Sequence, residues 1–325
     1  GTCTIQDDIN VTLSNTQSSG SITDFQLCDD LSNDGIETFD LSIRNTVVLA
    51  SVPTGNYSIS YHYSDSEAQS GNNPITNPIQ NSVNPQPIFT RIVDTDNGCL
   101  AFSSFNLIVN ALPTIVDPTP LVICDDQVAD GFTAIDLNIK DDEITNGQTN
   151  LNVTYHSTQS DANSGSNPFP MPYVNTNNNE TVFVSVQNAQ TGCISTTTLD
   201  ISVLDNPEIN TDPHYIDACD ADHDGFSEFD LTTILPDVLQ GLTNVTVTFH
   251  ETNDDALTGA NPIANDTNYA NINSNEQVVY IRVENNATGC ASITPIEIHT
   301  NLLLTATNIN NITPVSYTHL RAHET

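Results

Sequence analysis

Acidic turns in this sequence carry the residue types that bind calcium. The segment CDADHDGFSEFDL, at 219–231, places Asp220, Asp222 and Asp224 on alternate positions before Gly225. Calcium takes about six to eight oxygen ligands, favours several carboxylates and needs the sharp turn that a glycine permits. Aspartate and glycine also build ordinary solvated turns that hold no metal. The segment therefore predicts a Ca2+ loop, with a solvated turn as the alternative.

The same turn occurs twice more, as CDDLSNDGIETFDL from Cys28 and CDDQVADGFTAIDL from Cys124. When the copies are aligned on their Asp-Gly pair, the candidate ligands are Asp220, Asp222, Asp224 and Asp230, then Asp30, Ser32, Asp34 and Asp40, then Asp126, Asp130 and Asp136. Val128 replaces a ligand in the second of these copies along the chain. We therefore expect calcium affinity to be strongest at Asp220–Asp230. A leucine at the twelfth loop position excludes an EF-hand.

Other chemically capable residues also recur in phase. The histidines His62, His156 and His250 follow an aromatic residue at a predicted strand end, which favours a structural role because an active site would have to occur in triplicate. Arg91 and Arg282 share a position at which the middle copy has Ser185, and we expect each arginine to pair with a local carboxylate. The A-x-x-G-x-N-P pattern, as at 68–74, is typical of a turn. The sequence offers no catalytic triad, phosphate loop or zinc motif, so we expect no enzyme activity.

Cysteines and turns repeat about every 95 residues, the size of one small domain. The segment VSYTHLRAHET at the C-terminal end resembles a translated sequencing adapter and is excluded from the fold prediction. The predicted organisation is a remnant of an upstream repeat at 1–16, repeat 1 at 17–112, repeat 2 at 113–206, repeat 3 at 207–304, a linker at 305–314 and a non-native tail at 315–325.

The net charge of −36 restricts the partners of the chain. Nucleic-acid binding is excluded, since four basic residues before the tail cannot neutralise a phosphate backbone. The self-repulsion of the acidic residues favours a salty or calcium-bearing exterior over a cytosol. No segment has the length and apolar composition of a membrane span.

Seven cysteines in two phased classes predict disulfides and an oxidising compartment. Pairing within repeats joins Cys28 to Cys99, Cys124 to Cys193 and Cys219 to Cys290, and leaves Cys3. Pairing across the junctions joins Cys3 to Cys28, Cys99 to Cys124 and Cys193 to Cys219, and leaves Cys290. The second cysteine of each repeat opens a strand of about ten residues, roughly 33 Å long. Because a junction bridge would have to fold that strand back, the prediction favours pairing within repeats.

Repeat 2 illustrates the predicted fold. Alternating or apolar segments at 120–124, 131–139, 151–157, 181–187 and 193–204 are separated by Asn, Gly, Pro and Asp, which predicts the strands of a β-sandwich. Val182, Val184 and Val186 share one face, and Leu199, Ile201 and Val203 share one face of the next strand. Short helices are expected near Lys140 and before Ser164. The predicted fold class is all-β, with tandem Ig-like sandwich domains in a linear rod.

The segments CDADHDGFSEFDL, VTFHETNDDALTGANPI and VVYIRVENNATGCASI resemble the tandem repeats of very long surface proteins of gliding, type IX secreting bacteria. The resemblance implies export to the cell surface, adhesin or filament architecture and a C-terminal sorting domain outside this sequence.

We expect a structural, non-enzymatic stalk segment, disulfide-bonded and stiffened by calcium. Its expected partners are neighbouring repeats, with a surface glycan or protein receptor engaged through modules outside this sequence. The alternative is an array of ligand- or glycan-binding modules accessory to a catalytic domain.

Overall fold

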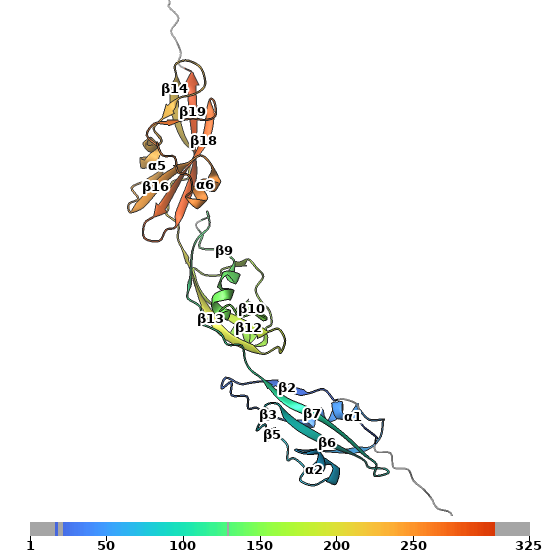
Figure 1. Ribbon diagram of the computed structural model, residues 1–325. Coiled ribbons are helices and arrows are strands. Elements are labelled where there is room, and N and C mark those ends of the chain that lie inside the picture. Colours follow the sequence, from blue (N-terminus) through green and yellow to red (C-terminus); the bar gives the residue numbers. More distant parts are fainter. Residues whose placement is uncertain (1–16, 19–21, 129, 303–325) are drawn as a thin grey trace, which may run out of the picture. The chain divides into compact units, whose positions relative to one another are not determined.

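The computed structural model describes residues 17–18, 22–128 and 130–302, and Figure 1 draws them as coloured ribbon. The expectations for residues 1–16, Cys3 included, and for residues 305–325 lie outside the described residues.

Repeat 1 is built on one sheet of long strands. Its order is β4 (Tyr57–His62), β6 (Gln86–Asp94), β7 (Leu100–Asn110), with antiparallel neighbours. The short strands β1 (Gln17–Ser18) and β2 (Phe25–Cys28) both lie beside β7 and run parallel to it. A separate antiparallel ladder and three short helices complete the repeat: β3 (Thr38–Phe39), β5 (Ile79–Gln80), η1 (Leu41–Arg44), α1 (Asn45–Leu49) and α2 (Asp65–Ser70).

Apart from β1, the elements of repeat 1 recur in repeat 2 in the same order. Its sheet runs β10 (Leu151–His156), β12 (Asn179–Asn188), β13 (Ile194–Leu204), β8 (Leu121–Cys124). The ladder and helices are β9 (Ala134–Ile135), β11 (Tyr173–Val174), η2 (Leu137–Lys140), α3 (Asp141–Thr145) and α4 (Gln159–Ser164).

Repeat 3 follows the pattern again, and its long strands lie side by side in Figure 1. The sheet order is β16 (Val245–His250), β18 (Glu276–Asn285), β19 (Ala291–Leu302), β14 (His214–Asp220). The remaining elements are β15 (Glu228–Phe229), β17 (Tyr269–Ala270), η3 (Leu231–Ile234), α5 (Leu235–Leu239) and α6 (Asn253–Thr258).

One face of each sheet forms the core. In repeat 1, Ile88 and Ile92 of β6 and Leu107 of β7 pack with Phe39 of the short ladder and Leu41 of η1 in one buried cluster. The predicted two-residue period is confirmed in repeat 2, where β12 buries Val182, Val184 and Val186 and β13 buries Leu199, Ile201 and Val203. Burial of such side chains contributes on the order of 2 kcal/mol each.

The A-x-x-G-x-N-P pattern forms a turn, as predicted, and this turn ends a short helix. In α4, Thr158 caps the first turn through its hydroxyl, and Gly165 ends the helix in the left-handed conformation at φ +64°. Asn167, also at positive φ, donates its side-chain amide to Asp161 at 2.8 Å. The pattern is therefore a self-contained turn.

The all-β fold class is confirmed, with three tandem sheet domains. The expected helices near Lys140 and before Ser164 are α3 and α4. The strand expected over 131–139 is only partly correct: it is limited to Ala134–Ile135, because Asp136 then caps η2. Among the described residues, no helix is long and apolar enough to cross a membrane.

Candidate functional site

The first cysteine of each repeat lies on the short strand that runs parallel to the last strand of the sheet. Cys28 ends β2 in register with Asn110, the final residue of β7. Cys124 ends β8 in register with Leu204, the final residue of β13. Cys219 lies on β14 in register with Asn301. Each of these cysteines is therefore placed where the last strand of its own repeat ends.

The second cysteine closes the hairpin turn before the last strand. In the turn before β13, the Asn188 side chain accepts the amides of Gln190 and Thr191, and the Asn188 amide donates to the carbonyl of Cys193 at 2.9 Å. Gly192 takes a φ of +77°, which an L side chain adopts only with strain. Asp94 and Asn285 organise the turns of Cys99 and Cys290 in the same way. The sequence thus presents this cysteine identically in all three repeats.

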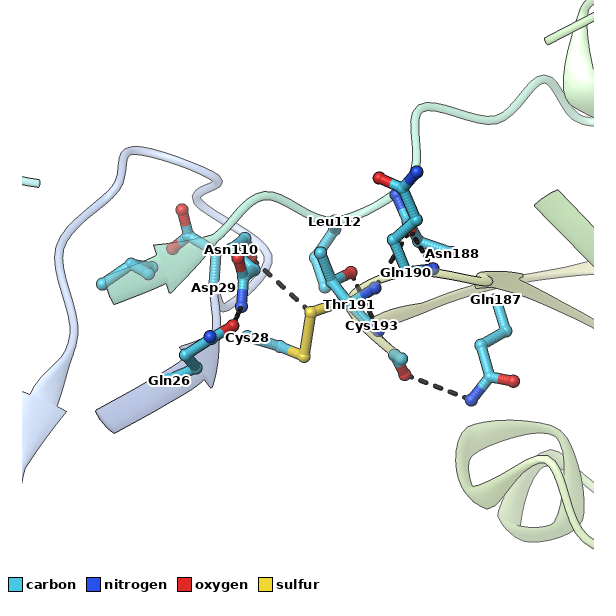
Figure 2. The surroundings of a disulfide bond; sticks show 12 residues. Gln26, Cys28, Asp29, Asn110, Leu112, Gln187, Asn188, Gln190, Thr191 and Cys193 are labelled. Carbon is cyan, nitrogen blue, oxygen red and sulfur yellow. Dashed lines mark hydrogen bonds between the residues drawn. A yellow bond between two sulfur atoms is a disulfide. The ribbon is translucent and has the colours of Figure 1, made fainter. Parts of the chain in front are cut away.

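Disulfides join the two classes of cysteine between consecutive repeats. Cys28 is bonded to Cys193 with a Cα–Cα distance of 5.5 Å (Figure 2), and Cys124 is bonded to Cys290 with a Cα–Cα distance of 5.4 Å. Cys99 and Cys219 carry free thiols. The predicted pairing within repeats is therefore wrong, and so is the alternative across the junctions. Of the six cysteines predicted to form disulfides, Cys99 and Cys219 do not form one among the described residues.

The length of the last strand explains why the two cysteines of one repeat do not bond to each other. Cys28 lies beside Asn110, whereas Cys99 immediately precedes Leu100 at the other end of β7. That strand has 11 residues, so the two cysteines of repeat 1 are separated by about 35 Å. A disulfide requires a Cα–Cα distance of roughly 4.4–6.8 Å. The strand-length argument excluded junction bridges and applies equally to bridges within a repeat.

Each linker is hydrogen-bonded near the disulfide to the repeat that follows it. Ser195, two residues after Cys193, donates its hydroxyl to the carbonyl of Pro113 at 2.6 Å. Ser292, two residues after Cys290, donates in the same way to Pro207 at 2.5 Å. Figure 2 also shows Asn110 donating its side-chain amide to Gln26 beside the bridge. The segment that joins two repeats is thus held by polar contacts as well as by the covalent bond.

An acidic loop begins immediately after the first cysteine, and a buried aspartate organises it. Asp29, Asp125 and Asp220 are at most 6% exposed. One carboxylate oxygen of each accepts the amide of the loop glycine, at 2.7 Å from Gly35, 2.7 Å from Gly131 and 2.8 Å from Gly225. The equivalence shows that the predicted alignment was displaced by one residue at its first position. The structural counterparts of Asp220 are Asp29 and Asp125 instead of Asp30 and Asp126.

A buried asparagine secures the loop from the other side, and the sequence prediction missed it. Asn175 is 2% exposed, accepts the amide of Thr133 at 2.7 Å and donates to the carbonyl of Gly131 at 2.7 Å. Asn81 and Asn271 make the same pair of bonds in repeats 1 and 3. The sequence does contain a sign of this role, because an asparagine directly follows the short strand β5, β11 or β17 in every repeat.

The structure brings together only some of the candidate calcium ligands. In repeat 3, Asp220, Asp222 and Asp224 each offer a carboxylate oxygen, and these oxygens lie within 4.8 Å of one another. In repeat 1, such a group of acidic residues contains Asp30 with Asp29 and Glu37, and does not include Asp34 or Asp40. Among the described residues of repeat 2, Asp126, Asp130 and Asp136 form no such group.

The last predicted ligand of each loop has another role. Asp40, Asp136 and Asp230 are the N-caps of η1, η2 and η3, and each carboxylate accepts the amide two residues ahead. This contact satisfies a helix amide that has no other backbone partner. Asp34, Asp130 and Asp224 likewise each accept the amide two residues ahead, which closes the turn after the glycine.

The carboxylates of the repeat 3 loop are electrostatically crowded. The amides of Gly225 and His223 donate to Asp220 and lower its pKa. The pKa of Asp222 is raised, first by its hydrogen bond with the Asp220 carboxylate and then by the negative charge of Asp224. Two ionised carboxylates at this separation repel each other, and a bound cation would relieve that repulsion.

The repeated histidines are structural, as predicted. His62, His156 and His250 are fully buried. In repeat 2, Nδ1 of His156 lies 2.7 Å from the carbonyl of Ser166, and Nε2 lies 2.9 Å from the hydroxyl of Thr154. Since a carbonyl only accepts, Nδ1 carries the proton, and the hydroxyl donates to Nε2. Both ring nitrogens are thereby satisfied within the repeat.

The repeated arginines lie against the end of a short helix. Arg282 donates to the carbonyls of Ala256 and Leu257 in α6 and pairs with Glu284 at 2.9 Å, which confirms the predicted carboxylate partner. Arg91 donates to two carbonyls of α2 and lies over the ring of Phe102. Among the described residues it forms no ion pair with a carboxylate, so the predicted pairing is wrong for this arginine. A cation at this end of a helix complements its dipole.

A family model described as "Flavobacterium inter-domain disulphide bond domain" matches residues 24–113, 120–207 and 215–304. No curated protein sequence matches the chain.

Solved structures with a similar course of the chain include an I-band fragment of titin, with 11% identity over 87% of this chain and 97% of that one and a TM-score of 0.27. Extracellular domains 3–5 of Drosophila OTK have 10% identity over 89% and 98% of the two chains and a TM-score of 0.24. The EC1-3 segment of Drosophila N-cadherin has 9% identity over 87% and 99% and a TM-score of 0.20.

Proposed function

The chain belongs to the Flavobacterium inter-domain disulphide bond family, and we propose that it is a stalk segment of a secreted or cell-surface, adhesin-like protein. Its task is to hold a binding module away from the cell. The segment itself is non-enzymatic in this proposal.

One observation supports the stalk most strongly: covalent bonds join consecutive repeats at two places, Cys28–Cys193 and Cys124–Cys290. A binding array or an enzyme does not require its domains to be bonded to one another in series. A stalk does, because each junction has to resist separation. The hydrogen-bonded linkers at Ser195 and Ser292 support the same function.

Location outside the cell is part of the proposal. Disulfides persist in oxidising compartments, and the net charge of −36 suits a salty exterior. Export by the type IX route follows from the resemblance of the repeats to surface proteins of gliding bacteria.

The stalk is tested by displaying the chain on a cell with an epitope tag at its free end. The height of the epitope above the membrane is then measured by super-resolution microscopy. We expect the height to rise with each repeat added in tandem and to become more variable when Cys28→Ser and Cys124→Ser are combined. An epitope height independent of repeat number would contradict the proposal.

The rival function, an array of glycan-binding modules, is tested with the same purified chain on a glycan array. A stalk segment binds none of the glycans specifically. Specific glycan binding at micromolar concentration would contradict the stalk and support the array of glycan-binding modules.

Calcium stiffening of repeat 3 is also part of the proposal. The fit of the donor set supports it, because Asp220, Asp222 and Asp224 bring three carboxylate oxygens within 4.8 Å of one another. Oxygen ligands of one calcium ion lie at about 2.3–2.6 Å from it, so they are separated by no more than about 5 Å. The loop directly follows Cys219, so a bound ion would rigidify the segment around that thiol.

A further inference from the structure

The connectivity of the disulfides defines two short covalent paths through the chain. We propose that these paths carry mechanical tension, so that the parts of each repeat between its two cysteines are left out of the loaded route. The inference rests on the proposed stalk for its biological setting. Its physical content depends only on which residues are bonded.

The first path begins on β2 of repeat 1. It passes from Cys28 through the disulfide to Cys193, follows β13 of repeat 2, and continues along the linker into β14 of repeat 3, where Cys219 lies. The bond between Cys28 and Cys193 bypasses a sequence separation of 165 residues. This path is called track 1.

The second path begins at Cys99 in repeat 1. It follows β7 and the linker into β8, passes from Cys124 through the disulfide to Cys290, and continues along β19 of repeat 3. This bond bypasses a separation of 166 residues. The path is called track 2.

The sheets place the two tracks side by side in every repeat. In repeat 1, β2 of track 1 pairs with β7 of track 2; in repeat 2, β13 pairs with β8; in repeat 3, β14 pairs with β19. All three pairs are parallel. Both tracks therefore run from N to C through every strand that they use, and neither has to reverse direction. The tracks keep one direction because the first and last strands of each sheet are parallel.

The free thiols lie at the ends of the tracks. Track 1 ends at Cys219, which is exposed, and track 2 begins at Cys99, which is partly exposed. Cys219 occupies the same place in its repeat as the bonded Cys28 and Cys124. Cys99 occupies the same place as the bonded Cys193 and Cys290. The two tracks are therefore open for extension by a further repeat of the same kind.

The consequence concerns unfolding under load. If the core of repeat 1 unfolds, residues 29–98 do not lengthen track 1, because tension leaves that repeat through Cys28. The loops, short helices and acidic turn of each repeat lie in the bypassed part, between the first and second cysteine. A track lengthens only by its own strands and linkers.

The test uses the free thiol of Cys219 as an attachment point for a DNA handle in optical tweezers, with the other handle on the N-terminus. The chain carries Cys3→Ser and Cys99→Ser, so that the four bonded cysteines and Cys219 remain. A maleimide forms a thioether, which survives reductant. The measured quantity is the contour length after all repeats have unfolded.

We expect the oxidised chain to be shorter than the reduced chain by the 165 residues that Cys28–Cys193 bypasses. At about 3.3–3.6 Å per residue this difference is roughly 550–600 Å. Cys124→Ser, the matched control, should leave the shortening intact, whereas Cys28→Ser should remove most of it and the double variant all of it.

Two outcomes would overturn the bypass: equal lengths with and without reductant, or a shortening that Cys124→Ser removes and Cys28→Ser leaves. The second would place a bond within repeat 2. Neither outcome depends on whether the chain is a stalk in the cell, since the epitope-height and glycan-array measurements test that function separately.

Discussion

Cys28 lies in register with Asn110 at the far end of β7, the full length of that strand from Cys99. The bond of Cys28 to Cys193 follows from this placement, since within the part of the chain that the structure describes the next repeat presents a cysteine at that end. The same relationship between Cys124 and Leu204 precedes the bond to Cys290. The parallel pairing of the first and last strands thus determines which cysteines meet.

The first prediction concerns disulfide connectivity. Peptide mapping without reduction should recover Cys28 joined to Cys193 and Cys124 joined to Cys290. Among the described cysteines, only Cys99 and Cys219 should react with a maleimide before reduction. A peptide joining Cys124 to Cys193 would contradict this pairing and support bridges within repeats.

Loss of one bridge should lower stability. Because the bond Cys28–Cys193 closes a long loop, Cys28→Ser should reduce the free energy of unfolding by about 2–5 kcal/mol. Cys219→Ser is the matched control, because it removes a free thiol at the equivalent position. Thermal melts that shift equally for both variants would show that the bridge does not stabilise the repeats.

The calcium proposal predicts that Asp222→Asn changes the melting temperature in opposite directions with and without calcium. The pKa of Asp222 is raised in the folded state, so its ionised form is disfavoured, and the cost appears as pH rises above the ordinary value of 3.8. At pH 7 in chelator, Asp222→Asn should therefore raise the melting temperature. In calcium the same variant should melt below the native chain, because a carboxylate ligand has been lost.

Asp230→Ala provides the control for that experiment. Asp230 caps η3 and lies outside the carboxylate group, so its loss should cost about 0.5–2 kcal/mol equally in calcium and in chelator. If the melting temperature of the native chain does not change with calcium, the loop is a turn that binds no metal.

Acid sensitivity should arise in part from Glu143. Its pKa is lowered to about 2 by hydrogen bonds from Lys140 and Thr119. A folded-state pKa below the ordinary value of 4.5 gives stability that is present above pH 4.5 and is lost as pH falls towards 2. Glu143→Gln should therefore be less stable than the native chain at pH 7, and the difference should shrink over that range in acid melts. The neighbouring exposed Asp142→Asn is the control, and an equal change in both variants would contradict a specific role for Glu143.

The buried side chain of Asn175 should contribute more to the free energy of unfolding than the exposed side chain of Asn177. Asn175→Ala leaves the amide of Thr133 and the carbonyl of Gly131 without their side-chain partner. We expect a loss of about 2–4 kcal/mol in the free energy of unfolding, measured by denaturant titration. Asn177→Ala, at an exposed position, should change stability by less than about 0.5 kcal/mol. Similar losses for both would show that the amide does not hold the loop.

The repeats, the all-β class and the local turns were predictable from the amino-acid sequence. These features depend on contacts between residues close in the chain, such as the alternation of Val182, Val184 and Val186 or the cap of Thr158 on α4. The length of the short strand at Ala134–Ile135 was overestimated, because the capping contact of Asp136 competes with strand extension. The crowding of Asp220 with Asp222 was predictable from their spacing, whereas the separate role of Asp230 as a cap was not.

The pairing of the cysteines depends on contacts between residues far apart in the chain. Each pairing rule recurs at a nearly constant interval along the chain, so regular spacing does not show at which end of a sheet a cysteine lies. The parallel placement of β2 beside β7 separates Cys28 from Cys99, and the next repeat brings Cys193 within bonding distance of Cys28. The buried contacts of Asn175 were hidden for the same reason, because they join residues that are more than 40 positions apart.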